Sequence, residues 1–143
     1  MRLIARRRAR AWQGVLVATT DSRRAIALSV LLGTAGTLHF AVPKQFDALV
    51  PRQLPGGKRL WTQLSGVAEV GVALAVAVPR TRRLGGLLAA LLFVAVFPGN
   101  VKMVVDWERK GVPPVRRAIA WGRLPLQWPL VAWALNVRDA ARR

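Results

Sequence analysis

The chain has 143 residues, 53% of them hydrophobic, and carries 23 Lys and Arg against 6 Asp and Glu, a formal net charge of +17. This length suits one domain, and in a soluble protein such a charge would indicate nucleic-acid binding. The basic residues instead lie in runs between long apolar stretches, as they do in membrane proteins, so we expect no nucleic-acid partner. The absence of cysteine excludes disulfides, CxxC redox centres and cysteine-ligated clusters.

Residues 1–24 are a basic arm that lacks the long apolar segment of a secretory signal. Trp12 and the Val15–Val17 run stand between arginines. Two interpretations remain open, namely a cytoplasmic segment that lies on anionic lipid and a disordered basic tail.

The first predicted membrane span covers residues 25–42 and ends at Pro43, because proline does not continue a helix. It would be ~27 Å long at ~1.5 Å per residue, close to the thickness of the hydrocarbon core. Residues 43–59 contain three prolines and the Gly56-Gly57 pair, which predict a loop or a short interfacial helix.

The second predicted span covers residues 60–78 and is followed by a short basic turn, so it should form an antiparallel hairpin with the third. The third span covers residues 84–107. Pro98 and Gly99 lie inside it and predict a kink or a local break.

The fourth predicted span, residues 118–137, contains Arg123, Pro125, Gln127 and Pro129. Pro125 is a further candidate for a helix break. The sequence thus predicts an all-α membrane protein, a bundle of four transmembrane helices over 25–137, followed by a basic tail at 138–143. Basic residues are more numerous in the arm, the 79–83 turn and the tail than in the other two loops, which predicts that both termini are cytoplasmic.

Polar side chains inside the spans gather in the half of the bundle opposite the termini, whereas the other half is almost purely apolar. Counted at ~1.5 Å per residue, Glu69 and Gln127 lie near the midplane. The candidate ligand-binding or polar-network residues are His39, Gln63, Glu69, Asn100, Lys102, Arg123 and Gln127.

Glu69 is the most informative of these residues, because a charged carboxylate near the bilayer centre costs at least ~2.5 kcal/mol. We expect it to be paired, hydrogen-bonded or protonated, and Arg123 and Lys102 are the candidate partners for an ion pair. Arg123 and Gln127 are four residues apart and share a helix face, and Gln63, Ser65 and Glu69 fall broadly on one side of their span.

This polar layer has two interpretations. In the first, it holds the helices together through interhelical hydrogen bonds worth ~0.6–2 kcal/mol each. In the second, it lines a pocket for a quinone head group or another lipophilic ligand or lipid, with which His39 and Glu69 exchange protons. The sequence offers no metal cluster, no covalently bound cofactor and no nucleophile–base pair, so we expect no catalytic activity of its own.

Six glycines within the spans predict close packing between helices and not phosphate-binding loops. They are Gly33, Gly36, Gly66, Gly71, Gly85 and Gly86.

An ordered set of short motifs resembles the DoxX family of small four-helix bacterial membrane proteins. The motifs are Gly36–Phe40 followed by Pro43, the Val50-Pro51 and Leu54-Pro55 pairs, Ser65–Glu69, Phe97–Asn100 and Arg123–Gln127. The resemblance covers residues 31–135 and leaves out the arm.

The resemblance implies a multi-pass protein of the bacterial inner membrane that is an accessory subunit of a quinone-linked redox complex, with membrane or peripheral redox proteins as partners. Other DoxX-like proteins are similar to scaffolds, chaperones or assembly factors, which leaves a non-catalytic structural role as the alternative. Because this chain lacks cysteine, it cannot itself carry sulfur as a persulfide.

Overall fold

The computed structural model describes the backbone of residues 2–141 and the side chains of residues 19–141. The described chain is helical, with no strand between residues 2 and 141, which confirms the all-α prediction. Its five helices are α1 (Arg2–Ala41), α2 (Pro43–Asp47), α3 (Lys58–Ala77), α4 (Arg82–Arg109) and α5 (Pro114–Ala140).

Three helices are long and apolar enough to cross a membrane, over Thr19–Ala41, Lys58–Ala77 and Arg82–Arg109. Apolar residues dominate these segments, and only 28%, 33% and 33% of the respective windows are buried inside the protein. The rest of each helix exposes Leu, Val and Ile side chains, as membrane spans do.

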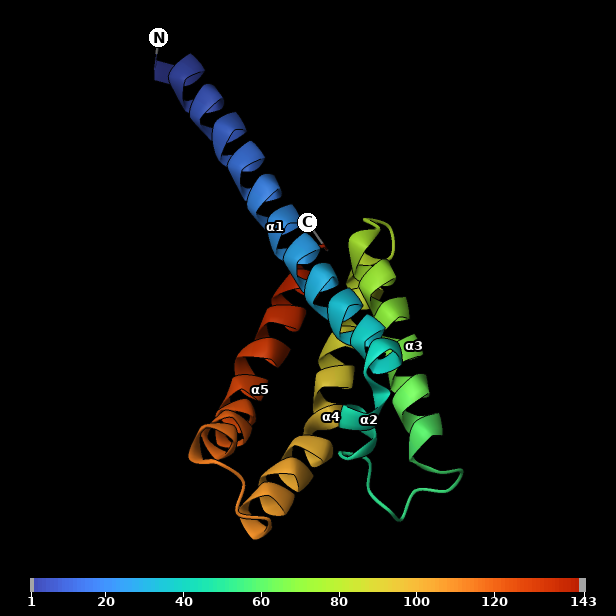
Figure 1. The fold of residues 1–143 in the computed structure, drawn as a ribbon. Coiled ribbons are helices and arrows are strands. Elements are labelled where there is room, and N and C mark those ends of the chain that lie inside the picture. The colour runs from blue at the N-terminus through green and yellow to red at the C-terminus, as the bar shows by residue number, and fades with distance from the viewer. Residues whose placement is uncertain (1, 142–143) are drawn as a thin grey trace.

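The basic arm is a direct continuation of the first span, because α1 runs without interruption from Arg2 to Ala41. Figure 1 shows the beginning of α1 extending well beyond the other helices. The arm backbone is therefore helical, whereas the side chains of residues 2–18 lie outside those that the structure describes.

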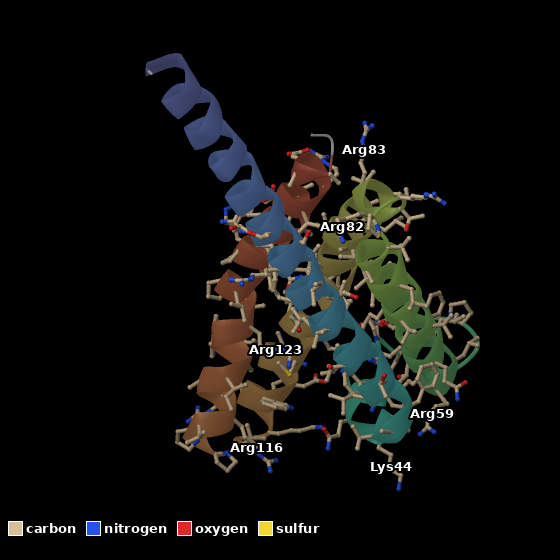
Figure 2. All side chains as sticks on the ribbon, turned by 90° about the horizontal axis from the view of Figure 1, so that it is seen from above. Lys44, Arg59, Arg82, Arg83, Arg116 and Arg123 are labelled. Atoms are coloured by element: carbon tan, nitrogen blue, oxygen red, sulfur yellow. The ribbon has the colours of Figure 1, made fainter. Side chains whose placement is uncertain are left out.

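The long helices run alternately up and down, so that two ends of the bundle are distinct (Figure 1). One end, called here the α2 end, holds α2 and the turn between α4 and α5. The other, called here the α3–α4 end, holds the turn at residues 78–81 and the last turn of α5. Figure 2 shows Lys44, Arg59 and Arg116 towards the α2 end and Arg82 and Arg83 at the opposite end.

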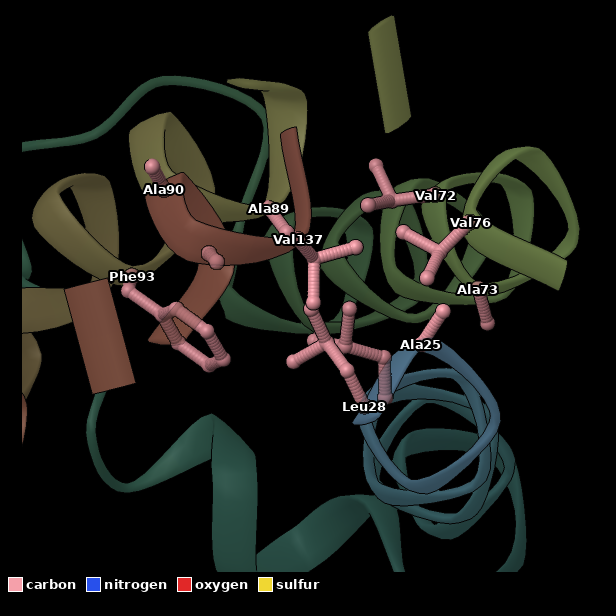
Figure 3. Close-up of a cluster of buried hydrophobic side chains, with 11 residues drawn as sticks. Ala25, Leu28, Val72, Ala73, Val76, Ala89, Ala90, Phe93 and Val137 are labelled. Atoms are coloured by element: carbon pink, nitrogen blue, oxygen red, sulfur yellow. The ribbon is translucent and has the colours of Figure 1, made fainter. Parts of the chain in front are cut away.

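Two pairs of helices, α1 with α3 and α4 with α5, make the most extensive contacts, and α3 with α4 joins the pairs. A cluster of small and branched apolar side chains fills the interior of the half nearer the α3–α4 end (Figure 3). It includes Leu28 and Leu32 from α1 and Val76 from α3, all almost completely buried.

Four of the six predicted glycine contacts bring helices close together. A Cβ atom at Gly36 or Gly66 would lie 2.9 Å or less from an atom across the α1–α3 contact, and one at Gly86 would lie 2.8 Å from the backbone nitrogen of Arg138 in α5. One at Gly85 would lie 2.6 Å from the backbone of Ala75.

The other two glycines do not make such a contact. Gly33 has only an ordinary contact with Ala73, and the prediction for Gly71 was wrong, because no atom lies within 4 Å of a Cβ built there.

Of the kink and the break predicted at Pro98, the break does not occur, and neither does the break predicted at Pro125. α4 continues through Pro98 and Gly99, and α5 continues through both Pro125 and Pro129. Proline removes one backbone donor, but the adjacent turns on both sides keep the helical conformation.

Candidate functional site

His39 in the last turn of α1 and Glu69 in the middle of α3 form a buried pair. The His39 Nδ1 atom lies 3.5 Å from Glu69 Oε2, and the two residues are 8% and 5% exposed. Because the backbone oxygen of Ala35 can only accept a hydrogen bond, His39 Nδ1 donates to it, at 2.8 Å. Ser65 donates a long hydrogen bond of 3.4 Å to Glu69 Oε1, and Oε2 has no hydrogen-bond partner.

The pair exists because α1 and α3 approach closely at two glycines. A Cβ at Gly66 would lie 2.9 Å from His39 Cβ and 3.0 Å from the backbone oxygen of Gly36. Any larger residue at this point would push the helices apart. The absence of side chains at Gly36 and Gly66 therefore determines how near His39 comes to Glu69.

The short helix α2 covers the pair at the α2 end. The Phe46 ring stacks on the His39 ring with centroids 3.8 Å apart and planes inclined by 27°. Next to Phe46, Asp47 accepts hydrogen bonds of 3.0 and 2.9 Å from Arg59 and one of 2.7 Å from Thr62, both in α3. The hydrogen bonds from Arg59 and Thr62 hold the pKa of Asp47 below its usual value.

Lys102 does not reach Glu69, contrary to our expectation. Its Nζ atom donates to the backbone oxygen of Ala48, at 3.0 Å, and forms an ion pair with Asp106 one turn further along α4. Lys102 thus ties the residue that follows α2 to α4. Leu49, next in the chain, packs against Met103 and Val104 of the same helix.

A second buried polar pair joins α4 to α5. Asn100 donates from Nδ2 to Gln127 Oε1, at 3.1 Å, and Gln127 donates from Nε2 to the backbone oxygen of Phe93. Both side chains are less than a tenth exposed. Three polar groups are satisfied within one contact, which is the arrangement expected of a structural interhelical hydrogen bond.

Arg123 and Gln63 lie outside both pairs, and the prediction that Arg123 is the partner of Glu69 was wrong. Both side chains are exposed. Gln63 and Glu69 are six residues apart, which places them about 120° apart around a helix. Arg123 is only one turn from Gln127, yet Gln127 is buried and Arg123 is exposed.

The role of Phe46 and the contacts of Asp47 with Arg59 and Thr62 were not predicted from the sequence. One signal was available, since Asp47 is the only acidic residue between positions 43 and 57. Which basic residue pairs with Asp47 depends on how α2 folds back over α3, and no local sequence pattern specifies this arrangement.

Elsewhere on the described surface, a shallow groove of about 430 Å³ lies along α1, lined by Val30, Gly33, Thr34, Thr37 and Leu38. None of the polar-layer residues lines it. Among residues 19–141, no group of three His, Asp or Glu side chains is placed to hold a metal ion.

Comparison with known proteins identifies the family but no characterised relative. No curated protein and no solved structure matches the chain. One family profile matches residues 28–138, a range that contains both polar pairs and the covering helix. The chain therefore belongs to the family described as Domain of unknown function (DUF8561).

Proposed function

We propose that the protein is an accessory subunit of a quinone-linked redox complex in a bacterial inner membrane, related to the DoxX family. In this proposal α5 is the fourth span and both termini are cytoplasmic. The resemblance of its motifs to that family and the unequal distribution of basic residues support these points. The subunit has no catalytic activity of its own, and its role is to bind a lipophilic ligand and exchange protons with it.

The observation that carries the proposal is the unsatisfied oxygen of Glu69. Burial of a carboxyl group without a partner for one oxygen destabilises a protein, so such groups are kept mainly where they act. His39 Nδ1 lies 3.5 Å from this oxygen, so an imidazole and a carboxyl group face each other in a buried site. A quinone carbonyl or quinol hydroxyl needs such a neighbouring group that donates and accepts protons.

The experiment is to purify the full chain in a mild detergent and to quantify co-purifying quinone by extraction and mass spectrometry. Glu69→Gln keeps the shape of the side chain and removes its titration, so we expect normal membrane accumulation and a quinone content lowered at least fivefold. Gln63→Ala, an exposed change in the same helix, is the matched control and should retain the quinone. Unchanged quinone content in Glu69→Gln would rule out the proposed site.

A structural role as a scaffold or assembly factor is the second candidate, favoured by the buried hydrogen bonds of Asn100 and Gln127 and by the close glycine contacts. If the polar layer only holds helices together, Glu69→Gln should reduce membrane accumulation and thermal stability, and a stably accumulating variant should leave quinone content unchanged. Glu69→Gln thus loses quinone if the protein is a redox subunit, and it loses membrane accumulation and thermal stability if the polar layer is structural.

A further inference from the structure

The interior on the α3–α4 side of Glu69 is closed to water. Val72, Ala73 and Val76 follow Glu69 along α3 and pack against Leu28 and Leu32 of α1 in the apolar cluster (Figure 3). Each of these side chains is at least nine-tenths buried. The Ser29 hydroxyl of α1 already donates to the backbone oxygen of Ala73, at 2.7 Å. A water molecule there would lack the two to four polar partners that it requires.

The α2 side of Glu69 is covered differently, by a segment that polar contacts hold in place. α2 has five residues and none is buried. Its fastening consists of the Asp47 contacts with Arg59 and Thr62 and the Lys102 bond to Ala48. The Asp47 and Arg59 side chains are 20% and 49% exposed, so water competes directly for their ion pair.

The segment between α2 and α3 also ends in two glycines, which can change conformation easily. Gly56 and Gly57 both have φ of +82°, a conformation that glycine adopts without strain. Release of the polar contacts would leave the Phe46 ring on His39 as the main attachment of α2 to the pair. Movement of α2 then exposes His39 and, beyond it, Glu69.

We infer that Glu69 exchanges its proton with the aqueous phase at the α2 end only, and that α2 is the cover whose displacement allows the exchange. The inference rests on the proposed function in taking the pair as a proton site, and it adds the side of entry and the moving part. The charged or titratable groups around the pair are His39 from α1, Asp47 from α2, Arg59 from α3, and Lys102 and Asp106 from α4, while Arg123 of α5 is exposed.

The cover is tested by the rate at which a water-soluble carbodiimide, which reacts with carboxyl groups, modifies Glu69 in the full chain in lipid nanodiscs. Peptide mass spectrometry assigns the adduct, and Glu69→Gln gives the background. Asp47→Asn combined with Thr62→Val weakens the part of the fastening that joins α2 to α3, and we expect modification at least threefold faster than in the parent. Thr62→Val alone is a milder variant that should give a smaller increase.

The matched control is Asp139→Asn, which removes the partner of Arg138 in an exposed ion pair at the α3–α4 end. It should leave the rate at Glu69 unchanged. Equal rates in the parent and the two fastening variants would overturn the role of α2. Absence of modification in every variant would overturn access of water to Glu69.

The side of entry is tested in sealed vesicles with a membrane-impermeant quaternary-ammonium carbodiimide. Since the chain has no cysteine, Arg80→Cys in the α3–α4 turn reports orientation through prior reaction with an impermeant maleimide. We expect mass spectra of the tryptic peptide 60–82, which contains position 80 and Glu69 as its only acidic residue, to show either the maleimide or the carbodiimide adduct and never both. Molecules that carry both labels would overturn one-sided access.

These outcomes are separate from those of the quinone experiment, because carbodiimide modification reports Glu69 whether or not a quinone binds. If the fastening variants change the modification rate as expected but no quinone co-purifies, the inference about α2 stands and quinone is rejected as the ligand. If quinone content depends on Glu69 but the fastening variants do not change the modification rate, the ligand stands and the inference about α2 is rejected.

Discussion

At the scale of single residues, two glycines control the chemistry of a pair to which they contribute no atoms. Gly36 and Gly66 let α1 and α3 approach until His39 Nδ1 is 3.5 Å from Glu69. Interactions between buried polar groups are sensitive to separation, since few water molecules screen them. A glycine in this position is therefore part of the site, although it carries no functional group.

Gly66→Ala should destabilise the protein by about 1–3 kcal/mol, because the new Cβ would lie 2.8 Å from the Phe40 ring and 2.9 Å from His39 Cβ. Thermal unfolding in detergent measures the effect. Gly71→Ala is the same change in the same helix with no atom within 4 Å, and it should stay within about 1 kcal/mol of the parent, on the stabilising side. A larger loss at Gly71 than at Gly66 would contradict the packing.

The Asn100–Gln127 contact should show energetic coupling in a double-mutant cycle. Asn100→Ala, Gln127→Ala and the double variant should give a coupling of about 0.6–1.7 kcal/mol, the range of interhelical hydrogen bonds in membranes. Chemical or thermal unfolding provides the four stabilities. A control cycle of Asn100→Ala with Gln63→Ala should give additive losses of stability. A coupling energy of equal size in this control would mean that the first cycle reports a general loss of packing.

At the scale of the helices, α2 is the element with the least apolar support. A helix this short is not stable by itself, so its position depends on the contacts of Phe46 and Asp47. Its stability should therefore respond to conditions that leave the long helices unchanged.

Acid should weaken the attachment of α2. The pKa of Asp47 is lower in the folded protein than its ordinary value of about 3.9, so the ionised carboxylate stabilises the folded state above that pH. This contribution is lost as the pH falls through the lower folded-state value. Asp47→Asn lacks it at every pH, and the difference in Tm between parent and variant should narrow between pH 6 and pH 3. If the Tm difference between parent and variant widens on acidification, the pKa of Asp47 is not lowered in the folded protein.

The long helices were predictable from the sequence because each apolar block must lie either in lipid or in the protein interior. The block at residues 84–107 corresponds to α4, which extends only two residues beyond it at each end. Pro98 does not break α4, because a proline removes only one hydrogen bond of a helix that has many others.

The pairing of polar residues was less predictable, since it depends on the rotation and crossing of whole helices. A count along the chain places Glu69 near the level of Gln127, but it does not say which helix α3 packs against. α3 packs most closely on α1, so Glu69 lies next to His39, while Gln127 lies across from Asn100. Ser65 was correctly placed beside Glu69 because a spacing of four residues keeps both on one face.

At the scale of the whole molecule, the number of spans depends on α5. Its Arg123, Gln127 and two prolines lower its hydropathy, and it is not among the three helices apolar enough to cross a membrane by composition. Its contacts with α4 are nevertheless the most extensive between any two helices of the described chain. They support the proposal that α5 is a fourth span.

Single-cysteine variants should define this topology, because the parent has no thiol. Arg52→Cys and Lys110→Cys lie at the α2 end, and Arg80→Cys and Ala141→Cys lie at the other. In sealed vesicles of one orientation, an impermeant maleimide should label one of these pairs and spare the other. If Lys110→Cys and Ala141→Cys react from the same side, α5 does not cross the membrane.

The small buried share of the three spans makes the surrounding lipid a large part of their packing. About seven-tenths of the residues in each span window are not fully buried in the protein, so acyl chains can contact much of the surface of these helices. Chain length and saturation of the host bilayer should consequently shift the folding equilibrium as strongly as many substitutions do. For this protein the solvent is a structural component, and its composition belongs in any statement of stability.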